Sequence, residues 1–304
     1  MNSVFFGMDE KSLRDLCRNH IDTFESWSRR LIHEELTGLY GDDYFNHKFI
    51  DGKPLVKKEI KNEVASRASE NPTRFPRLID AIDTGDTECF FCRDNLYSSI
   101  FKPVFEPFYS GQAEIRSIFH RIVPIRNKLC HVNTISHREA EQCLCYTNDF
   151  IDVFKAYYKS KGNEKKYNVP LVLRIKDSLG NDFPRPETKH SWKIKLNGHP
   201  DGNSQEINLR SGEGYKLWLD VDSSFDSSLY DIWWHVEKPF IVDGVIAKGT
   251  GKEISFIATN QLVSYSPEIV INVIQKKEWH RLGTMDDYIV VTLGEVLPPI
   301  DETY

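Results

Sequence analysis

The chain has 304 residues, with 39 Lys and Arg against 45 Asp and Glu, so its formal net charge is -6. Hydrophobic residues make up 40% and charged residues 28%, a globular balance that excludes collagen, low-complexity disorder and a disulfide-stapled miniprotein. The acidic total also excludes a protein that coats nucleic acid through a general positive field. At about 100–200 residues per domain, this length predicts two domains.

The first residues, MNSVFFGMDEKSLRDL, lack the pattern of a signal peptide, and the chain has no run of about eighteen apolar residues that could span a membrane. All cysteines lie in the first half of the chain, which does not suit a disulfide framework for the whole protein. These features predict a cytoplasmic protein with free thiols and no membrane contact.

Apolar residues in the first half recur at helical spacing. The first helix is expected to begin near Asp9, with an apolar stripe from Leu13 to Leu31. Residues 38–54 are rich in turn formers and predict a loop with a short hairpin. Further helices are expected at residues 57–68, 77–82, 88–105, 113–132 and 136–160. The last of them begins with Ser136 and Glu139, which match a capping box. Residues 1–160 are therefore predicted to be an all-α helical bundle.

Cys89 and Cys92 have the C-x-x-C spacing of redox and zinc sites. A zinc ion needs four ligands, and no second C-x-x-C or H-x-x-x-H follows at usable spacing. We therefore interpret both cysteines as small buried side chains on a helix, and expect no metal ion or other cofactor.

The pattern changes at residues 161–168, a polar segment that we interpret as a linker. Beyond it, the apolar segments are short and several alternate with period two, as strands do. They lie at residues 169–175, 191–196, 214–221, 232–236, 254–258, 269–274 and 288–293. Residues 169–304 are therefore predicted to form an all-β sandwich of immunoglobulin-like type, which makes the chain a multi-domain α + β protein. One of the adjacent Trp233 and Trp234 should be buried, and the other should lie where a protein or ligand trigger could bind.

One segment departs from the acidic balance. Residues 115–138 contain no carboxylate, although five cations and three histidines lie there. The cations are Arg116, Arg121, Arg126, Lys128 and Arg138. Such a local positive field could hold a phosphate group, and the alternative is a solvated helix face whose cations pair with acidic residues elsewhere.

Within this segment, Arg126, Asn127 and His131 form the pattern R-N-x-x-x-H. On a helix, Asn127 and His131 share a face one turn apart, whereas Arg126 is offset from His131 by about 140°. The long Arg126 side chain could still reach a phosphate beside the histidine, or a second subunit could complete the site. Pro124, just upstream, is expected to kink or start the helix, which should end just beyond His131.

The segment IRNKLCHVN, followed by SHREAEQCLCYTNDFIDVF, resembles the signature of the HEPN superfamily (higher eukaryotes and prokaryotes nucleotide-binding). Upstream, SWSRRLIHEELTGLYGDDYF resembles the early part of HEPN domains in abortive-infection and related bacterial defence proteins. The resemblance covers residues 9–160, about half the chain. It implies an all-helical, metal-independent endoribonuclease that works as a homodimer, with the two motifs facing each other across the interface.

RNA can be cut without a metal ion when its 2′-hydroxyl attacks the adjacent phosphorus, leaving a 2′,3′-cyclic phosphate and a 5′-hydroxyl. For this chemistry we assign general acid/base catalysis to His131, transition-state charge to Arg126, and orientation of the histidine or a phosphate oxygen to Asn127. Backbone phosphates would be bound by Lys128, Arg121 and Arg116. DNA lacks the 2′-hydroxyl and would not be cut by this route.

The sequence thus predicts a HEPN-like ribonuclease that acts on RNA, tRNA among the candidates, in a phage-defence, abortive-infection or toxin-like system. The β domain would recognise a trigger or partner, or fix the dimer. The alternative is a non-catalytic HEPN-like scaffold whose Arg126 and His131 bind a nucleotide or a partner, and the net acidity favours it because an RNA enzyme gains from a positive approach field. A third hypothesis is a plain structural adaptor.

Overall fold

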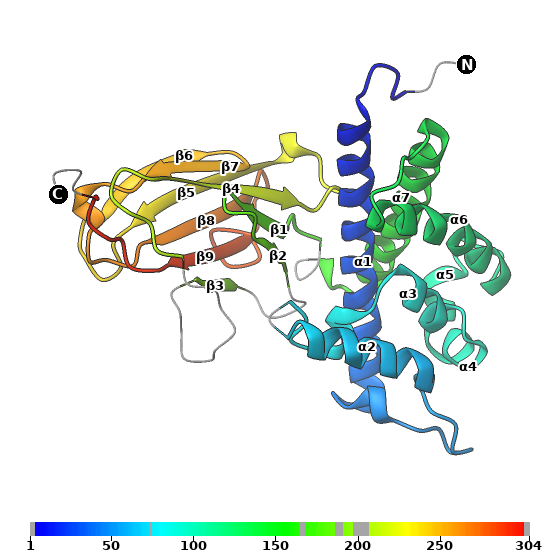
Figure 1. Ribbon diagram of the computed structural model, residues 1–304. Helices are drawn as coiled ribbons and strands as arrows, with labels where there is room; N and C mark the ends of the chain where they lie inside the picture. Colours follow the sequence, from blue (N-terminus) through cyan, green and yellow to red (C-terminus); the bar gives the residue numbers. More distant parts are fainter. Residues whose placement is uncertain (1–3, 73, 165–167, 186–190, 197–206, 301–304) are drawn as a thin grey trace. The chain divides into compact units, whose positions relative to one another are not determined.

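A computed structural model describes residues 4–72, 74–164, 168–185, 191–196 and 207–300 of the chain. The chain divides into two compact units, Met1–Asn168 and Val169–Tyr304 (Figure 1). Helices make up the first unit and strands make up the second, so the α + β organisation expected from the sequence is present. None of the helices in the described part combines the length and apolar character that a bilayer crossing requires.

Seven α-helices are found among the described residues of the first unit. They are α1 (Glu10–Tyr40), α2 (Lys58–Glu70), α3 (Thr84–Phe91), α4 (Asp94–Leu96), α5 (Lys102–Phe105), α6 (Gln112–Cys130) and α7 (His137–Ser160). Short 3-10 turns lie at Tyr44–Asn46 and Leu78–Ala81, and a π-helical turn lies at Tyr97–Phe101. The expected hairpin in the first loop is present as a single antiparallel bridge between Lys48 and Pro54.

Both predicted helix starts that carry a capping residue are confirmed. Asp9 is the N-cap of α1, and its Oδ1 accepts a hydrogen bond from the Ser12 amide at 2.9 Å. Ser136 is the N-cap of α7, where its side chain and that of Glu139 form the capping box. Local hydrogen bonds of this kind link residues three apart, so they can be predicted from the sequence alone.

The long helices α1 and α7 lie side by side and enclose an aromatic core (Figure 1). Phe24 of α1 packs against Phe150 of α7 with ring centroids 5.3 Å apart, and both side chains are fully buried. Cys17 contacts Cys143, and further along both helices Trp27 contacts Tyr158. Residue numbers rise in the same direction on both helices, so α1 and α7 run parallel. The apolar stripe predicted on α1 therefore faces the core.

Two helix predictions need correction. The single helix expected at residues 88–105 is divided, because the backbone is extended at Arg93. The Arg93 guanidinium donates a hydrogen bond to the Leu55 carbonyl. Apolar residues lie on both sides of this break, which falls at the polar residues Arg93, Asp94 and Asn95. The helix expected at residues 77–82 is only the 3-10 turn Leu78–Ala81, because Asp83 caps α3 and the chain is extended at Ile82.

Pro124 does not start a helix. α6 begins twelve residues earlier, at Gln112, so Pro124 lies inside it and His120 belongs to the same helix as the motif. α6 ends at Cys130, two residues before the expected end, and His131 is its C-cap.

The second unit has nine described strands in two sheets. One sheet has the order β2-β1-β4-β7, with β1 (Val172–Asp177), β2 (Asp182–Pro184), β4 (Gly214–Val221) and β7 (Glu253–Ile257). The other has the order β3-β9-β8-β5-β6, with β3 (Trp192–Leu196), β5 (Tyr230–Glu237), β6 (Val245–Thr250), β8 (Glu268–Gln275) and β9 (Asp287–Leu293). The β3–β9 pair is parallel and the other pairs are antiparallel. All seven predicted strands are present, and β2 and β6 were not predicted.

Residues from both sheets form one buried cluster, so the sheets pack face to face. On β5, Trp234 points into this cluster, whereas the adjacent Trp233 is 54% exposed, as the strand alternation predicted. Gly249 of the neighbouring β6 is required there, because a Cβ at that position would collide with the Trp234 ring.

Candidate functional site

The R-N-x-x-x-H motif occupies the end of α6. Arg126 and Asn127 lie in its last turns, and His131 caps it with its backbone N–H bound to the Asn127 carbonyl at 3.1 Å. The next two amides return to the helix: Val132 donates to the Leu129 carbonyl and Asn133 to the Lys128 carbonyl. This is a Schellman ending, which satisfies two carbonyls that the helix would otherwise leave free.

Val132 adopts the left-handed conformation in this ending, with φ +59°. Glycine is the usual residue there, because a β-branched side chain is strained at positive φ. Val132 is 68% exposed, so apolar burial does not offset the strain. The residue after the candidate catalytic histidine is therefore a strained position, of the kind that recurs at functional sites.

The His131 side chain is exposed and has no hydrogen-bond or ion-pair partner among the described residues. Five residues of helix separate it from Arg126, an axial rise of about 7.5 Å. An imidazole that is accessible and unpartnered can accept or donate a proton, which a buried or ion-paired one cannot do freely.

Arg126, in contrast, is held by carboxylates. Its Nη2 lies 3.3 Å from Oδ2 of Asp83, and its Nε lies 3.7 Å from Oε1 of Glu25. Its Nη1 donates to Oδ1 of Asn127 at 3.3 Å, and the side chain is 24% exposed. The guanidinium is therefore fixed in orientation, and its charge is compensated within the chain.

Glu25 is the centre of this arrangement and is only 8% exposed. Its Oε1 accepts hydrogen bonds from the Thr84 amide at 3.0 Å and the Thr84 hydroxyl at 2.7 Å. Its Oε2 accepts from Nη2 of Arg29 at 2.7 Å. Both oxygens of this buried carboxylate therefore have hydrogen-bond donors, as a buried polar group requires.

Asp83 joins the same network through the start of α3. Its Oδ1 accepts the amides of Gly85 and Asp86 as the helix cap, which leaves Oδ2 for Arg126. Asp86 in turn accepts from Nη1 of Arg67 at 2.7 Å. Burial raises the pKa of Asp86, and the hydrogen bond from Arg67 opposes that rise. Three guanidinium groups and three carboxylates are thus brought together, and their charges cancel; they are Arg29, Arg67, Arg126, Glu25, Asp83 and Asp86.

Two of the three cations predicted to bind phosphate also have carboxylate partners. Arg116 donates to the Cys92 carbonyl at 2.6 Å and its Nε lies 3.7 Å from Glu88. Lys128 donates to Glu139 at 2.5 Å, which connects α6 to the first turn of α7. Arg116 and Lys128 therefore match the alternative considered from the sequence, in which cations of the helix face pair with acidic residues elsewhere.

Arg121 and Arg138 have no carboxylate partner in the described part of the chain. Arg121 donates to the Tyr146 hydroxyl at 2.5 Å, and no carboxylate pairs with it in the described part of the chain. Arg138 is exposed, and the same part of the chain contains no partner for its side chain. The positive field of residues 115–138 is therefore weaker than their composition suggests.

Sequence reasoning missed the polar stripe of α1. Arg18, Glu25 and Arg29 recur at spacings of seven and four, so they lie on one face of the helix. Arg18 donates to the Leu129 carbonyl at 2.8 Å, and Arg29 donates to the Ile82 carbonyl. The heptad spacing of these charged residues was the signal that could have revealed a second, polar contact face on α1.

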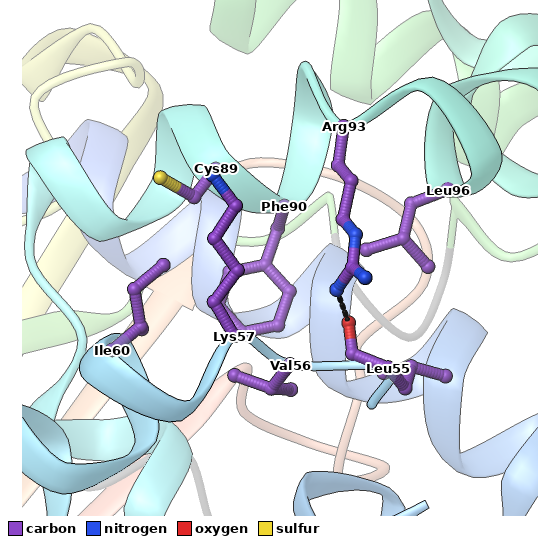
Figure 2. Close-up of a pocket in the computed structure, with 8 residues that line it drawn as sticks. All are labelled: Leu55, Val56, Lys57, Ile60, Cys89, Phe90, Arg93 and Leu96. Carbon is purple, nitrogen blue, oxygen red and sulfur yellow. Dashed lines mark hydrogen bonds between the residues drawn. The ribbon is translucent and has the colours of Figure 1, made fainter. Parts of the chain in front are cut away.

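Cys89, the first residue of the C-x-x-C pair, lines a small cavity of about 10 Å³, shown in Figure 2. Apolar side chains line most of it, with Cys89, Lys57 and Arg93 at its margin. Cys92 is buried, and burial raises its pKa to about 12, which keeps its thiol protonated. Burial also raises the pKa of the half-buried Cys89. The described residues contain no cluster of His, Cys, Asp and Glu that could hold a metal ion.

The adjacent carboxylates Asp286 and Asp287 of the second unit are fully buried and point to different partners. Asp286 accepts from the Gln275 amide and lies 3.0 Å from His280 Nδ1. Asp287 accepts two hydrogen bonds from Arg185, at 2.6 and 2.8 Å. Each carboxylate is satisfied within the sheet margin, which is a structural use of buried charge.

Comparisons with known proteins identify no relative: no family model matches the chain, and neither does any curated protein.

Proposed function

We propose that this protein is a metal-independent endoribonuclease of the HEPN type, with His131 as its acid/base residue. The proposal is carried by one observation, the exposed and unpartnered imidazole of His131 on the helix that holds the fixed guanidinium of Arg126. The resemblance of the motif and of the capped helix after it to HEPN domains supports the same assignment.

The reaction needs a base for the 2′-hydroxyl proton, an acid for the leaving 5′-oxygen, and positive charge beside the phosphorane. His131 would transfer the protons. Arg126 would meet the developing charge in an orientation set in advance by Glu25 and Asp83. Asn127, exposed on the same face of α6, would orient the phosphate or the imidazole. No metal ion or cofactor enters this scheme.

A homodimer would complete the site. One chain contributes a single R-N-x-x-x-H motif, whereas the reaction needs both an acid and a base. The solvent face of α6 carries Asn127 and His131 and would bring the second motif close if two copies paired along it. We therefore propose a dimer formed through the helical unit.

For the second unit we propose an immunoglobulin-like sandwich that binds a trigger or partner. Numbered as immunoglobulin strands, β1, β4 and β7 correspond to A, B and E in one sheet, and β9, β8 and β5 correspond to G, F and C in the other. Trp234 then occupies the buried position on strand C that is typical of these domains. The exposed Trp233 is the residue through which we propose that the partner is bound.

The decisive experiment incubates the purified full-length chain with total RNA and with tRNA in EDTA, and analyses the new ends. Cleavage with 2′,3′-cyclic phosphate ends, lost by at least a hundredfold in His131→Gln, is expected, since acid/base catalysis contributes about 10²–10⁴-fold. Asp152→Ala, an exposed change on α7, is the matched control. Wild-type protein that leaves RNA intact, or His131→Gln that cuts normally, refutes the assignment.

A non-catalytic scaffold is the second candidate, because three of the five cations in residues 115–138, Arg116, Arg126 and Lys128, are already paired with carboxylates in the chain. It predicts nucleotide binding by calorimetry with no RNA cleavage. We propose the ribonuclease for a cytoplasmic phage-defence, abortive-infection or toxin-like system, and cleavage of host RNA on expression in bacteria is the corresponding test.

A further inference from the structure

The N-terminal part of α1 lies against the end of α6 that carries His131. Arg18 of α1 contacts Leu129, whereas Glu25, two turns further along α1, contacts Arg126. Because one residue number rises as the other falls, α1 and α6 run antiparallel. Arg14, one turn before Arg18, is therefore level with the turn at residues 131–136 that follows α6.

Arg14 and Arg18 are two cations on one face of α1, and neither forms an ion pair with a described residue. Arg18 is held in place by its hydrogen bond from Nη2 to the Leu129 carbonyl, so its other N–H groups remain available. The Nε of Arg14 is buried and has no hydrogen-bond partner among the residues that the structure describes. A buried donor without an acceptor costs free energy, as do two like charges one turn apart, and a bound anion would relieve both.

We infer that Arg14 and Arg18 form a phosphate-binding site beside His131. The ligand is a phosphodiester of the RNA next to the one that is cut, so the inference rests on the proposed ribonuclease function. Guanidinium groups suit this ligand because each offers several N–H donors in one plane to phosphate oxygens.

The site replaces the phosphate contacts expected from residues 115–138. Arg116 and Lys128 are neutralised by Glu88 and Glu139, whereas Arg14 and Arg18 keep their full charge. The exposed Arg138, in the first turn of α7, adds a third uncompensated cation to the same end of the helical unit, because α1 and α7 run parallel and begin together. Substrate binding thus depends on residues of α1 that lie outside the motif.

The test measures binding of a fluorescent 2′-O-methyl RNA oligonucleotide, which the proposed 2′-hydroxyl chemistry cannot cut, to the full-length chain. Arg14→Gln and Arg18→Gln remove the charge but keep a side-chain donor, so the bond to the Leu129 carbonyl can persist. Each is expected to weaken binding about tenfold and to lower the slope of log affinity against log salt by about 0.7 per lost phosphate contact.

Lys159→Gln is the matched control, because it removes one positive charge from the opposite end of α7. It should bind RNA as wild type does. Arg18→Lys restores the charge and is expected to recover most of the affinity, and with cleavable RNA Arg18→Gln should raise KM while kcat stays close to the wild-type value.

Several outcomes overturn the site. The site is overturned if Arg14→Gln and Arg18→Gln bind RNA as tightly as the Lys159→Gln control. The ribonuclease assignment still stands in that case if His131→Gln abolishes cleavage. A lower melting temperature in Arg18→Gln with no recovery by Arg18→Lys shows a purely structural role. If wild-type protein neither binds nor cuts RNA, the site and the proposed function fail together.

Discussion

The last turns of α6 and the residue that caps the helix differ in whether their ionisable side chains have partners. Arg126, in the last turns, is held between Glu25 and Asp83 in a neutral network with little exposure. Five residues later His131 is exposed and unpartnered, and the neighbouring Arg18 has no carboxylate within the described residues. The same motif thus combines a structurally fixed cation with a free imidazole.

Each half suits a different requirement of catalysis. A guanidinium fixed by buried carboxylates needs no reorganisation when charge develops on the substrate. A group that transfers protons must instead be reached by the substrate and by water. The comparison predicts that changes at Arg126 also lower stability, whereas changes at His131 act mainly on function.

The largest effect is expected from Glu25→Ala. This change leaves Arg29, Arg126 and the Thr84 amide without their buried acceptor, and removing one partner of a buried ion pair costs about 3–5 kcal/mol. Denaturant unfolding measures this loss of unfolding free energy. Asp152→Ala, an exposed change, is the control and should stay within about 0.5 kcal/mol of wild type. Equal stability of the two variants would contradict the network.

The next prediction sets the two ends of the motif against each other. Arg126→Gln should lower the free energy of unfolding by about 1–3 kcal/mol, because Glu25 and Asp83 lose a charged donor. His131→Gln should stay within about 0.5 kcal/mol of wild type, because its side chain has no described partner. Paired urea titrations check this, and a larger loss in His131→Gln would reverse the comparison.

The third prediction concerns pH. The hydrogen bond from Lys128 holds the pKa of Glu139 below its ordinary value of 4.5. A lowered folded-state pKa stabilises the protein above about pH 4.5, and this stabilisation is lost as the pH falls through the folded-state value. Glu139→Gln should cost about 0.5–1 kcal/mol at pH 7 and lose less stability than wild type between pH 5 and pH 3. Urea unfolding at each pH decides, and identical pH profiles would argue against the Lys128 contact.

The smallest effect is expected at the strained end of α6. Val132→Gly should raise the free energy of unfolding by about 0.5–1 kcal/mol, because relief of the left-handed strain exceeds the added chain entropy of glycine. Val123→Gly, a half-buried helical position of α6, should instead destabilise the protein. A destabilised Val132→Gly would show that the valine side chain has a packing role.

Sequence patterns predicted elements whose signals are local. The caps at Asp9 and Ser136 and the period-two strands follow from residues within a few positions of each other, and the structure contains them. The division of residues 88–105 could not be predicted in this way. Apolar residues lie on both sides of the break, and the break depends on the distant Leu55 carbonyl that Arg93 binds.

The candidate site shows the same limit. Arg126, Asn127 and His131 can be selected from their spacing, and their helix ends two residues before the expected position. The carboxylates that surround Arg126 cannot be selected in this way, because Glu25 lies about a hundred residues and Asp83 about forty residues before it in sequence. Arg14 and Arg18 were equally hidden, because their importance depends on the antiparallel packing of α1 against α6.

By itself, the sequence determined the two-part α + β organisation, the helix caps, most of the strands and the position of the R-N-x-x-x-H motif. Periodicity and capping chemistry act over a few residues, so they can be recognised without a structure. The tertiary structure alone decided which cations near the motif are neutralised and which remain free. Ion pairs depend on distance in space, and here that distance is set by how α1, α3 and α6 pack together.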